Sequence, residues 1–462
     1  VSGKRKLMRN FDCASESKGN YLYQPYDFLL LSAKIPKSWK LIFLDAVAEH
    51  YNTQDLISKC ESNNPLVIVI AMADANWNKD LEFLKRIKKL FADKYILVFG
   101  DSFFEQSAID IVRPYVSGVI DNPLDVDFSE YADPGLKSTE LSGIKSFSKL
   151  EKVSKKPKSR LLGLPRHESF VSKSYRWPFA EFKRYTTVFT AWGCPYSCSY
   201  CIMAKFPNLY RPVNDVIEEL DYVHELGYKE IYIGDRSFGL PKKNVESILL
   251  AMIQKKYNFR WSSYFHPNQY DPKTLELMKE SGCHTLIIGI ESKKFDHLKN
   301  FSRTIRHDDF YNLLNHSKRL GIKICGDFLI GLPGESYDDV IETIKFSCKI
   351  PIDYASFNIV APLSGSSIRS EAIKEGKLNE NDRHFDSLGA ERVLASDKLS
   401  SRELLFLRNY AVKRFYLRPT YLFKRLITIK SFEQFFIQFQ EMLQLFKKSK
   451  LLGVLFRRSL WR

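Results

Sequence analysis

The chain has 462 residues, of which 44% are hydrophobic and 14% aromatic, so it is too apolar for a disordered protein and long enough for two or three domains. Its eight cysteines are too sparse for a secreted disulfide scaffold. The formal net charge is +16, and residues 401–462 carry 14 Lys and Arg against 3 acidic residues, which argues against a uniformly basic nucleic-acid-binding surface.

The first 135 residues alternate apolar runs with amphipathic segments. The segments 55–62 and 79–91 have helical spacing, and the apolar runs predict buried strands. We expect these strands at 26–31, 41–44, 66–70, 96–99 and 118–120. Short strands that alternate with helices predict a Rossmann-like parallel sheet. Residues 136–184 form an expected linker, because 136–160 is rich in Ser and Lys and nearly free of strand signals.

Residues 185–400 repeat a strand–helix unit six times. The predicted strands are 186–192, 230–235, 260–266, 285–292, 323–332 and 354–363. Predicted helices between them include 213–226, 272–281, 308–320 and 337–349. Six such units predict an α/β partial barrel, a (β/α)6 arrangement, with its chemistry at the carboxyl ends of the strands.

Three cysteines follow the first barrel strand closely. Cys194, Cys198 and Cys201 lie in the run Gly-Cys-Pro-Tyr-Ser-Cys-Ser-Tyr-Cys. Thiolates are the usual ligands of iron–sulfur clusters, and three of them leave the fourth iron of a [4Fe–4S] cluster open to another ligand. Zinc is the alternative, but it needs a fourth Cys or His, and His167 and His224 are more than 20 residues away. The spacing therefore favours the cluster.

The CxxxCxxC spacing after a first barrel strand resembles the signature of the radical S-adenosylmethionine superfamily. The resemblance implies that the open iron binds the amino and carboxylate groups of S-adenosylmethionine. An electron from the cluster then breaks the S–C5′ bond, and the resulting 5′-deoxyadenosyl radical removes a hydrogen atom from substrate.

The same resemblance implies roles for five further residues. Tyr200 matches the aromatic position that packs beside the adenine, and Asp235 stands where relatives often have an acidic pair. Glu291 and Asp327 resemble residues that bind the ribose hydroxyls, and Arg303 resembles an arginine that pairs with the cofactor carboxylate. The last four also have ordinary structural interpretations, as strand-end caps, a buried turn former or a helix-start residue.

A Rossmann-like domain before the barrel and a basic helical tail after it resemble the cobalamin (B12)-binding subgroup of the superfamily. The subgroup's DxHxxG motif is incomplete, because Asp45 matches its aspartate but Val47 stands at its histidine. Gly100-Asp101 stands where a Gly-Gly pair would let the nucleotide tail of cobalamin approach closely. Cobalamin binding is therefore left open, and the alternative is a domain that only shapes the substrate cavity.

Residues 401–462 predict a basic amphipathic helical tail. The segment 432–446 has a broad apolar stripe, which predicts either core packing or docking on an anionic membrane. The residues expected to contact such a membrane are Lys447, Lys448, Lys450, Arg457, Arg458 and Trp461. Neither a cleavable leader nor a membrane-spanning run is recognised, so we expect a cytoplasmic protein that is at most peripheral to a membrane.

The leading hypothesis is a radical enzyme, supplied by a reducing electron donor, that acts at an unactivated carbon of a hydrophobic or lipid-linked small molecule. Methylation, cyclisation and carbon–carbon bond formation are all open. One alternative is RNA modification by the same chemistry, although no recognisable RNA-binding module is present. The other is a non-enzymatic interaction protein stabilised by zinc.

Overall fold

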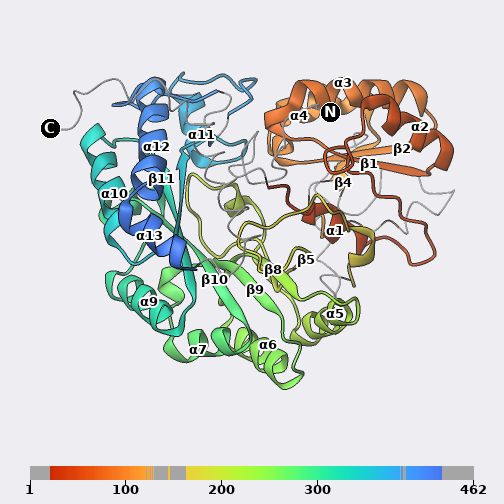
Figure 1. Cartoon of the computed structure of the whole chain (residues 1–462). Coiled ribbons are helices and arrows are strands. Elements are labelled where there is room, and N and C mark those ends of the chain that lie inside the picture. Colours follow the sequence, from red (N-terminus) through yellow and green to blue (C-terminus); the bar gives the residue numbers. More distant parts are fainter. Residues whose placement is uncertain are drawn as a thin grey trace.

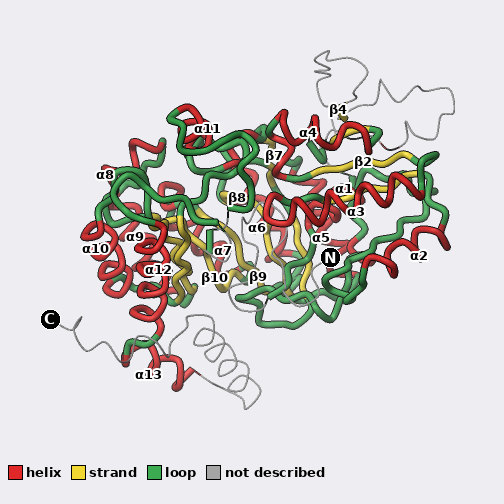
Figure 2. The backbone as a smooth tube through the Cα atoms, turned by 90° about the horizontal axis from the view of Figure 1, so that it is seen from above, coloured by secondary structure: helices red, strands yellow, loops and turns green. Residues whose placement is uncertain are grey.

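The structure, a computed structural model, describes residues 21–120, 122–124, 126, 128, 144–145, 163–385, 387–388 and 392–428. Residues 136–143 and 146–162 of the predicted linker 136–184, and the apolar stripe 432–446 with the basic residues after it, lie outside the described residues. Two mainly parallel sheets lie side by side (Figures 1 and 2). Across the residues described, no helix is both long and apolar enough to cross a lipid bilayer.

The N-terminal sheet has the strand order β1-β2-β3-β4. Its parallel strands are β1 (Val67–Ala71), β2 (Tyr95–Phe99) and β3 (Gly118–Ile120), and β4 (Ile144–Lys145) pairs antiparallel with β3. Its helices are α2 (Thr53–Asn63), α3 (Trp77–Leu90) and α4 (Gln106–Val112). The predicted strands 66–70, 96–99 and 118–120 are thus confirmed, as are both predicted helices.

Two of the predicted strands are wrong. Residues 26–31 belong to the helix α1 (Tyr26–Ser32), six of whose seven residues are buried. A helix that is buried all round has no polar face, so its apolar run resembles a buried strand. Residues 41–44 form no strand, and Ile42 is 37% exposed.

The second sheet is the partial barrel, in the order β12-β11-β10-β9-β8-β5. All five pairings are parallel and join strands that are successive in that order, so each unit adds the next strand at one edge. The strands are β5 (Tyr185–Val188), β8 (Glu230–Phe238), β9 (Arg260–Phe265), β10 (Cys283–Glu291), β11 (Lys323–Ile330) and β12 (Tyr354–Ile359). The six predicted strands are confirmed.

Helices cover the outer face of this sheet (Figure 1). They are α5 (Val213–Glu225), α6 (Lys242–Gln254), α7 (Pro272–Glu280), α9 (His307–Leu320) and α10 (Tyr337–Lys349), and they include all four predicted helices. In α9, Phe310, Leu313 and Leu314 are fully buried in the core between helices and sheet. The helix ends at Gly321, whose φ of 68° is the left-handed conformation that glycine adopts without steric cost.

Aromatic side chains fill part of the inner face of the barrel. Trp177, from the segment before β5, stacks on Tyr232 at 3.9 Å and donates its indole N–H to the Ser262 hydroxyl at 2.7 Å. Ile287 and Cys325 belong to the same buried cluster. Tyr232, Ser262 and Cys325 lie in the first halves of their strands, so this packing leaves the carboxyl ends as the place for chemistry.

The helical C-terminal segment packs on the last barrel strand. After α11 (Ser367–Lys374), the helix α12 (Ser401–Tyr416) lies beside α10 and β12, and α13 (Pro419–Thr428) follows it (Figure 1). Leu404, Leu407 and Phe415 of α12 are buried in the barrel core. The Tyr416 hydroxyl donates to the carbonyl of Ala355 at 2.8 Å. The first part of the basic tail therefore completes the outer layer of the barrel.

Candidate active site

The three cysteines lie in a loop closed by a short antiparallel pair, β6 (Ala191–Trp192) and β7 (Leu209–Tyr210). Gly193 begins this loop with φ 79°, and a Cβ there would lie 2.3 Å from the carbonyl oxygen of Pro207, so the turn requires glycine. Ser199 fixes the far side of the loop, because its N–H donates to Phe301 O at 3.0 Å and its carbonyl accepts from Ile368 N at 3.1 Å.

Asp235, in β8, holds the turn that leads into the cysteine loop. One carboxylate oxygen accepts the N–H groups of Thr190 (2.7 Å) and Ala191 (3.1 Å), and the other accepts the Thr190 hydroxyl. Burial raises the pKa of Asp235 to about 6, although these hydrogen bonds favour the charged form. Asp235 is thus bound to the backbone before Cys194.

The three thiol groups are near enough to act on one another electrostatically, with Cys198 buried and Cys194 and Cys201 half-buried. Burial raises the pKa of all three, that of Cys201 to about 12, and the neighbouring Cys198 thiol raises the pKa of Cys194 and Cys201 further. Arg303 and Arg236 oppose this effect: Arg303 at Cys194 and Cys198, and Arg236 at Cys194 and Cys201. Ligands must lose their protons to bind a metal, so nearby cationic groups help the thiolates to form.

This donor set fits a cluster better than a single ion. In the part of the chain that the structure describes, no three Cys, His, Asp or Glu side chains converge as ligands of one metal ion. In a [4Fe–4S] cluster each cysteine binds its own iron, so the three sulfurs need to be near one another without sharing a centre. Three neighbouring thiols on one loop, with two arginines beside them, meet that requirement.

Glu291 ends β10 in a strained backbone conformation. Its φ is 63°, which is uncommon for a residue other than glycine and costs backbone strain. Its side chain is buried, and burial raises its pKa to about 7; Asp327 raises it further and Arg303 opposes. Arg303 donates to the carbonyl oxygen of Gly289. A Cβ on Gly289 would lie 2.5 Å from Glu291 Oε1 and 3.0 Å from Arg303 Nη2.

Most of the predicted site residues are therefore neighbours. Arg303 and Glu291 both act electrostatically on Tyr200 and Cys198, and Asp327, half-buried on β11, acts on Glu291. The cysteine loop, the end of β10 and the second half of β11 thus meet near the carboxyl edge of the barrel, which is where the sequence places the chemistry.

His266, which directly follows β9, belongs to the same region, although a single histidine without ligand spacing does not stand out in the sequence. Its ring stacks on Tyr196 of the cysteine loop at 3.9 Å, and its Nδ1 accepts the N–H of Asn268 at 3.1 Å. Burial, with Arg303 and Arg306, lowers its pKa to about 2, so the ring is neutral and Nε2 carries the proton. Within the described residues this buried Nε2–H has no partner. The position after the third strand was its only signal.

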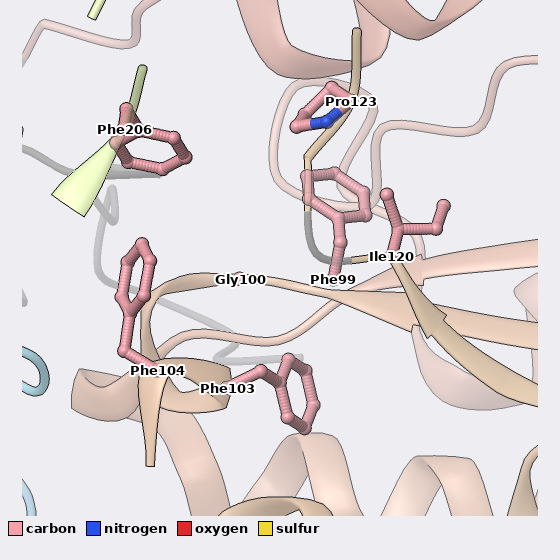
Figure 3. Close-up of a pocket in the computed structure, with 7 residues that line it drawn as sticks. All are labelled: Phe99, Gly100, Phe103, Phe104, Ile120, Pro123 and Phe206. Atoms are coloured by element: carbon pink, nitrogen blue, oxygen red, sulfur yellow. The ribbon is translucent and has the colours of Figure 1, made fainter. Parts of the chain in front are cut away.

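An apolar pocket lies between the N-terminal sheet and the cysteine loop (Figure 3). The seven residues that line it are Phe99, Gly100, Phe103, Phe104, Ile120, Pro123 and Phe206. Phe206, from the loop after Cys201, meets Phe104 edge-on at 5.2 Å and Trp192 at 5.5 Å. The pocket therefore connects the carboxyl ends of β2 and β3 with the cysteine loop.

Comparison with known proteins agrees with this geometry. Residues 190–347 match the model of the radical SAM superfamily. An uncharacterised methyltransferase of Pyrococcus horikoshii is 28% identical over 415 residues, which cover 87% of this chain and 89% of that protein. The bacteriochlorophyllide d C-8(2)-methyltransferase of Chlorobaculum tepidum is 23% identical over 42% of this chain and 46% of its own length.

Two solved structures share the fold. The cobalamin-dependent S-adenosylmethionine radical enzyme OxsB, with aqua-cobalamin and S-adenosylmethionine bound, has a TM-score of 0.66 at 14% identity and covers 92% of this chain and 70% of its own. The radical S-adenosylmethionine methyltransferase TsrM from Kitasatospora setae, with cobalamin and a [4Fe–4S] cluster bound, has a TM-score of 0.62 at 14% identity, covering 76% and 72%.

Fold and site together define an α/β partial barrel with a loop of three cysteines at its mouth. Residues 190–347 form a domain of the radical S-adenosylmethionine superfamily, whose members use a [4Fe–4S] cluster and S-adenosylmethionine, and the fold of the chain is similar to that of the cobalamin-dependent enzymes OxsB and TsrM. The alternative of a zinc-stabilised, non-enzymatic protein is set aside.

Proposed function

We propose that this chain is a corrinoid-dependent radical methyltransferase that modifies an unactivated carbon of a hydrophobic small molecule. The observation that carries the proposal is the aromatic pocket, which brings the edge of the Rossmann-like sheet next to the cysteine loop through Phe104 and Phe206. The names of the Pyrococcus and Chlorobaculum relatives support methyl transfer, and the latter acts on a macrocycle, a bacteriochlorophyllide.

The residues of the pocket suit contact with a corrinoid ring, but the space they enclose is only about 10 Å³, enough for one water molecule, so we infer that a ring lies over these side chains and not between them. Phenylalanine faces suit a large flat macrocycle, whereas the bare side of Gly100 is already filled, since a Cβ there would lie 1.8 Å from the Met72 carbonyl oxygen. Asp101, which the sequence marked as an obstacle, does not line the pocket, because its carboxylate accepts the N–H groups of Asp74 and Ser102. The position next to Gly100 therefore presents no carboxylate to the ring.

In this proposal Asp45 stabilises the loop in which it lies and does not contact the corrinoid. Its Oδ1 accepts the N–H groups of Val47 and Ala48, and its Oδ2 accepts the Tyr175 hydroxyl at 2.8 Å. Valine stands at the motif's histidine position, and the histidine that this loop does contain, His50, is exposed and lies three residues further on. We infer that the ring is held by shape and apolar contact.

At the barrel mouth, Cys194, Cys198 and Cys201 would hold three irons of the cluster. When bound, the cluster and S-adenosylmethionine supply the electron and the carbon radical that hydrogen abstraction needs. Arg303 offers a guanidinium to the cofactor carboxylate, and Glu291 and Asp327 are carboxylates suited to the vicinal ribose hydroxyls.

The remaining predicted residues have supporting roles. Tyr200 offers an aromatic face to the adenine, and Asp235 positions the loop through Thr190 and Ala191. The buried aromatic packing around Trp177 limits the access of water from the first halves of the strands. A lipid-linked substrate and membrane docking of the tail stay predictions, since the tail residues concerned lie outside the described part.

The test is product analysis of the full chain, reconstituted anaerobically with iron, sulfide and hydroxocobalamin, then reduced in the presence of S-adenosylmethionine. Methyl transfer leaves S-adenosylhomocysteine, whereas reductive cleavage leaves 5′-deoxyadenosine and methionine. We expect both products, with the first dependent on the corrinoid, and the same result for Cys60→Ala, which changes a cysteine remote from the site.

Formation of 5′-deoxyadenosine without corrinoid uptake or S-adenosylhomocysteine would contradict methyl transfer. Salt-sensitive binding of tRNA would instead favour RNA modification. The observation in favour of this alternative is a similarity to the tRNA-2-methylthio-N(6)-dimethylallyladenosine synthase of Lachnoclostridium phytofermentans, which is 24% identical over 38% of this chain.

A further inference from the structure

Beyond the pocket, the carboxyl edge of the N-terminal sheet is covered by charged side chains of the chain itself. Arg383, from the segment after α11, donates to Asp74 Oδ1 and to the Ser107 hydroxyl, each at 3.2 Å. Its guanidinium lies 4.6 Å from the centre of the Trp77 ring. Arg383 and Trp77 are only 5% and 4% exposed, so this part of the edge is closed to solvent.

The loops that follow β1 and β2 are tied to each other beneath Arg383. Asp101 accepts the N–H of Asp74 at 3.1 Å, and the Ser102 hydroxyl donates to Asp74 Oδ1 at 3.4 Å. A Cβ on Gly100 would lie 1.8 Å from the carbonyl oxygen of Met72, which shows that the two strand ends touch. Within the described residues, no opening separates β1 from β2 here.

A second buried arginine fixes the segment that carries Arg383. Arg369, in α11, forms a two-pronged pair with the carboxylate of Glu105, and its Nη2 also donates to the carbonyls of Glu380 and Asp382 at 3.1 and 2.8 Å. Arg369 is 1% exposed. The cover over the sheet edge is therefore anchored on both the barrel and the N-terminal domain.

We propose that this domain binds its corrinoid by the ring alone and keeps the edge after β1 and β2 closed to the nucleotide tail, so that cobalamin and tail-free cobinamide bind equally well. The inference rests on the proposed function. A nucleotide that entered this edge would displace Arg383 and leave Asp74 buried without its charge partner, which is strongly unfavourable. In the subgroup motif, a Gly-Gly pair leaves room for the nucleotide tail. In this chain Asp101 and its hydrogen-bond partners occupy that room.

The experiment is a pair of anaerobic titrations of the full-length, cluster-loaded protein with hydroxocobalamin and with diaquacobinamide, followed by visible absorbance. We expect dissociation constants that agree within about threefold. Cobalamin binding tenfold or more tighter than cobinamide would overturn the inference while leaving corrinoid use intact. Binding of neither would overturn the corrinoid assignment, and the inference with it.

A variant separates this account from the rival in which Arg383 turns to bind the phosphate of the tail. We expect Arg383→Gln to change the two affinities by the same factor, whereas selective loss of cobalamin affinity would support the rival and contradict the inference. Arg392→Gln is the matched control, because Arg392 lies on the same segment but pairs with Asp382 at the surface, 47% exposed. Melting curves of both variants check that they are folded.

Discussion

At the scale of single residues, Gly289 limits how the site can be assembled. An alanine there would press its Cβ on the ends of the Glu291 and Arg303 side chains, at 2.5 and 3.0 Å, and push both from their positions. We expect Gly289→Ala to weaken S-adenosylmethionine binding about tenfold, which corresponds to about 1.4 kcal/mol. Equilibrium dialysis of the cluster-loaded protein measures this effect.

The control for this variant is Gly326→Ala on the neighbouring strand β11. Its Cβ would be crowded to a similar degree, 2.8 Å from Ile290 Cδ1, but against apolar atoms. It should lower stability without a comparable loss of S-adenosylmethionine affinity. If both variants weaken binding equally, Gly289 has no special relation to Glu291 and Arg303.

Asp101 makes the stability of the N-terminal domain depend on pH. Burial and the neighbouring Asp74 raise the pKa of Asp101 to about 7, against about 4 in an unfolded chain. Between these values the folded state binds the extra proton, so stability that is present below pH 4 is lost as the pH rises through 7. Each unit of pKa difference corresponds to about 1.4 kcal/mol.

Asp101→Asn removes this titration and keeps an oxygen to accept the backbone N–H groups. Melting temperatures measured from pH 5 to pH 8 should therefore fall less for the variant than for the natural chain. Parallel pH profiles for the two proteins would show that Asp101 is already ionised in the folded state at pH 5.

The predicted residues differ in how far sequence alone could place them. The cysteines carry their own spacing signal, so the loop could be predicted. The role of Asp235 could not, because an aspartate in a strand gives no indication that its oxygens are taken by Thr190 and Ala191. His266 could not be predicted as part of the site either, because a single histidine has no spacing pattern and its stacking on Tyr196 exists only in three dimensions.

At the scale of elements, α12 extends the barrel beyond its sixth strand. Phe415 is fully buried against Phe357 of β12, with ring centres 6.3 Å apart. We expect Phe415→Ala to cost about 3–5 kcal/mol of unfolding free energy, the range for removing a buried phenylalanine side chain. Urea unfolding monitored by circular dichroism is the measurement.

Phe423, in α13, is the matched control, since it is 67% exposed. Its replacement by alanine should change the unfolding free energy by less than about 0.5 kcal/mol. Equal losses for the two variants would mean that α12 packs no more tightly than α13.

Among the elements, the barrel strands could be predicted because each carries a β-rich apolar run between amphipathic helices. The N-terminal domain was harder, as α1 shows: Phe28 packs on Phe99 at 5.0 Å and Tyr26 on Phe189 at 5.7 Å, so both domains bury this short helix. Its apolar run reports burial and leaves the conformation undetermined.

At the scale of the whole molecule, the pair Arg369–Glu105 joins the barrel to the N-terminal domain across 264 residues of sequence. Glu105→Gln leaves a buried guanidinium without its counter-charge. We expect a loss of about 3 kcal/mol, at the lower end for a broken buried pair because backbone carbonyls still accept from Arg369. Limited proteolysis should also cleave the chain faster between the two domains.

The exposed pair Arg260–Glu181 provides the comparison. Glu181→Gln should cost less than about 1 kcal/mol, because both side chains are about one-third exposed and solvent screens the interaction. If Glu105→Gln costs no more than Glu181→Gln, the two domains are not held together by this pair.

The account as a whole depends on the cysteine loop of the barrel. The most direct measurement is iron and zinc analysis, with electron paramagnetic resonance of the dithionite-reduced state, on anaerobically prepared full-length protein and on Cys198→Ala. We predict about four irons per chain in the natural protein, a reduced-cluster signal that changes when S-adenosylmethionine is added, and loss of both in the variant. One zinc per chain, or a variant that keeps its iron and its signal, would contradict the account.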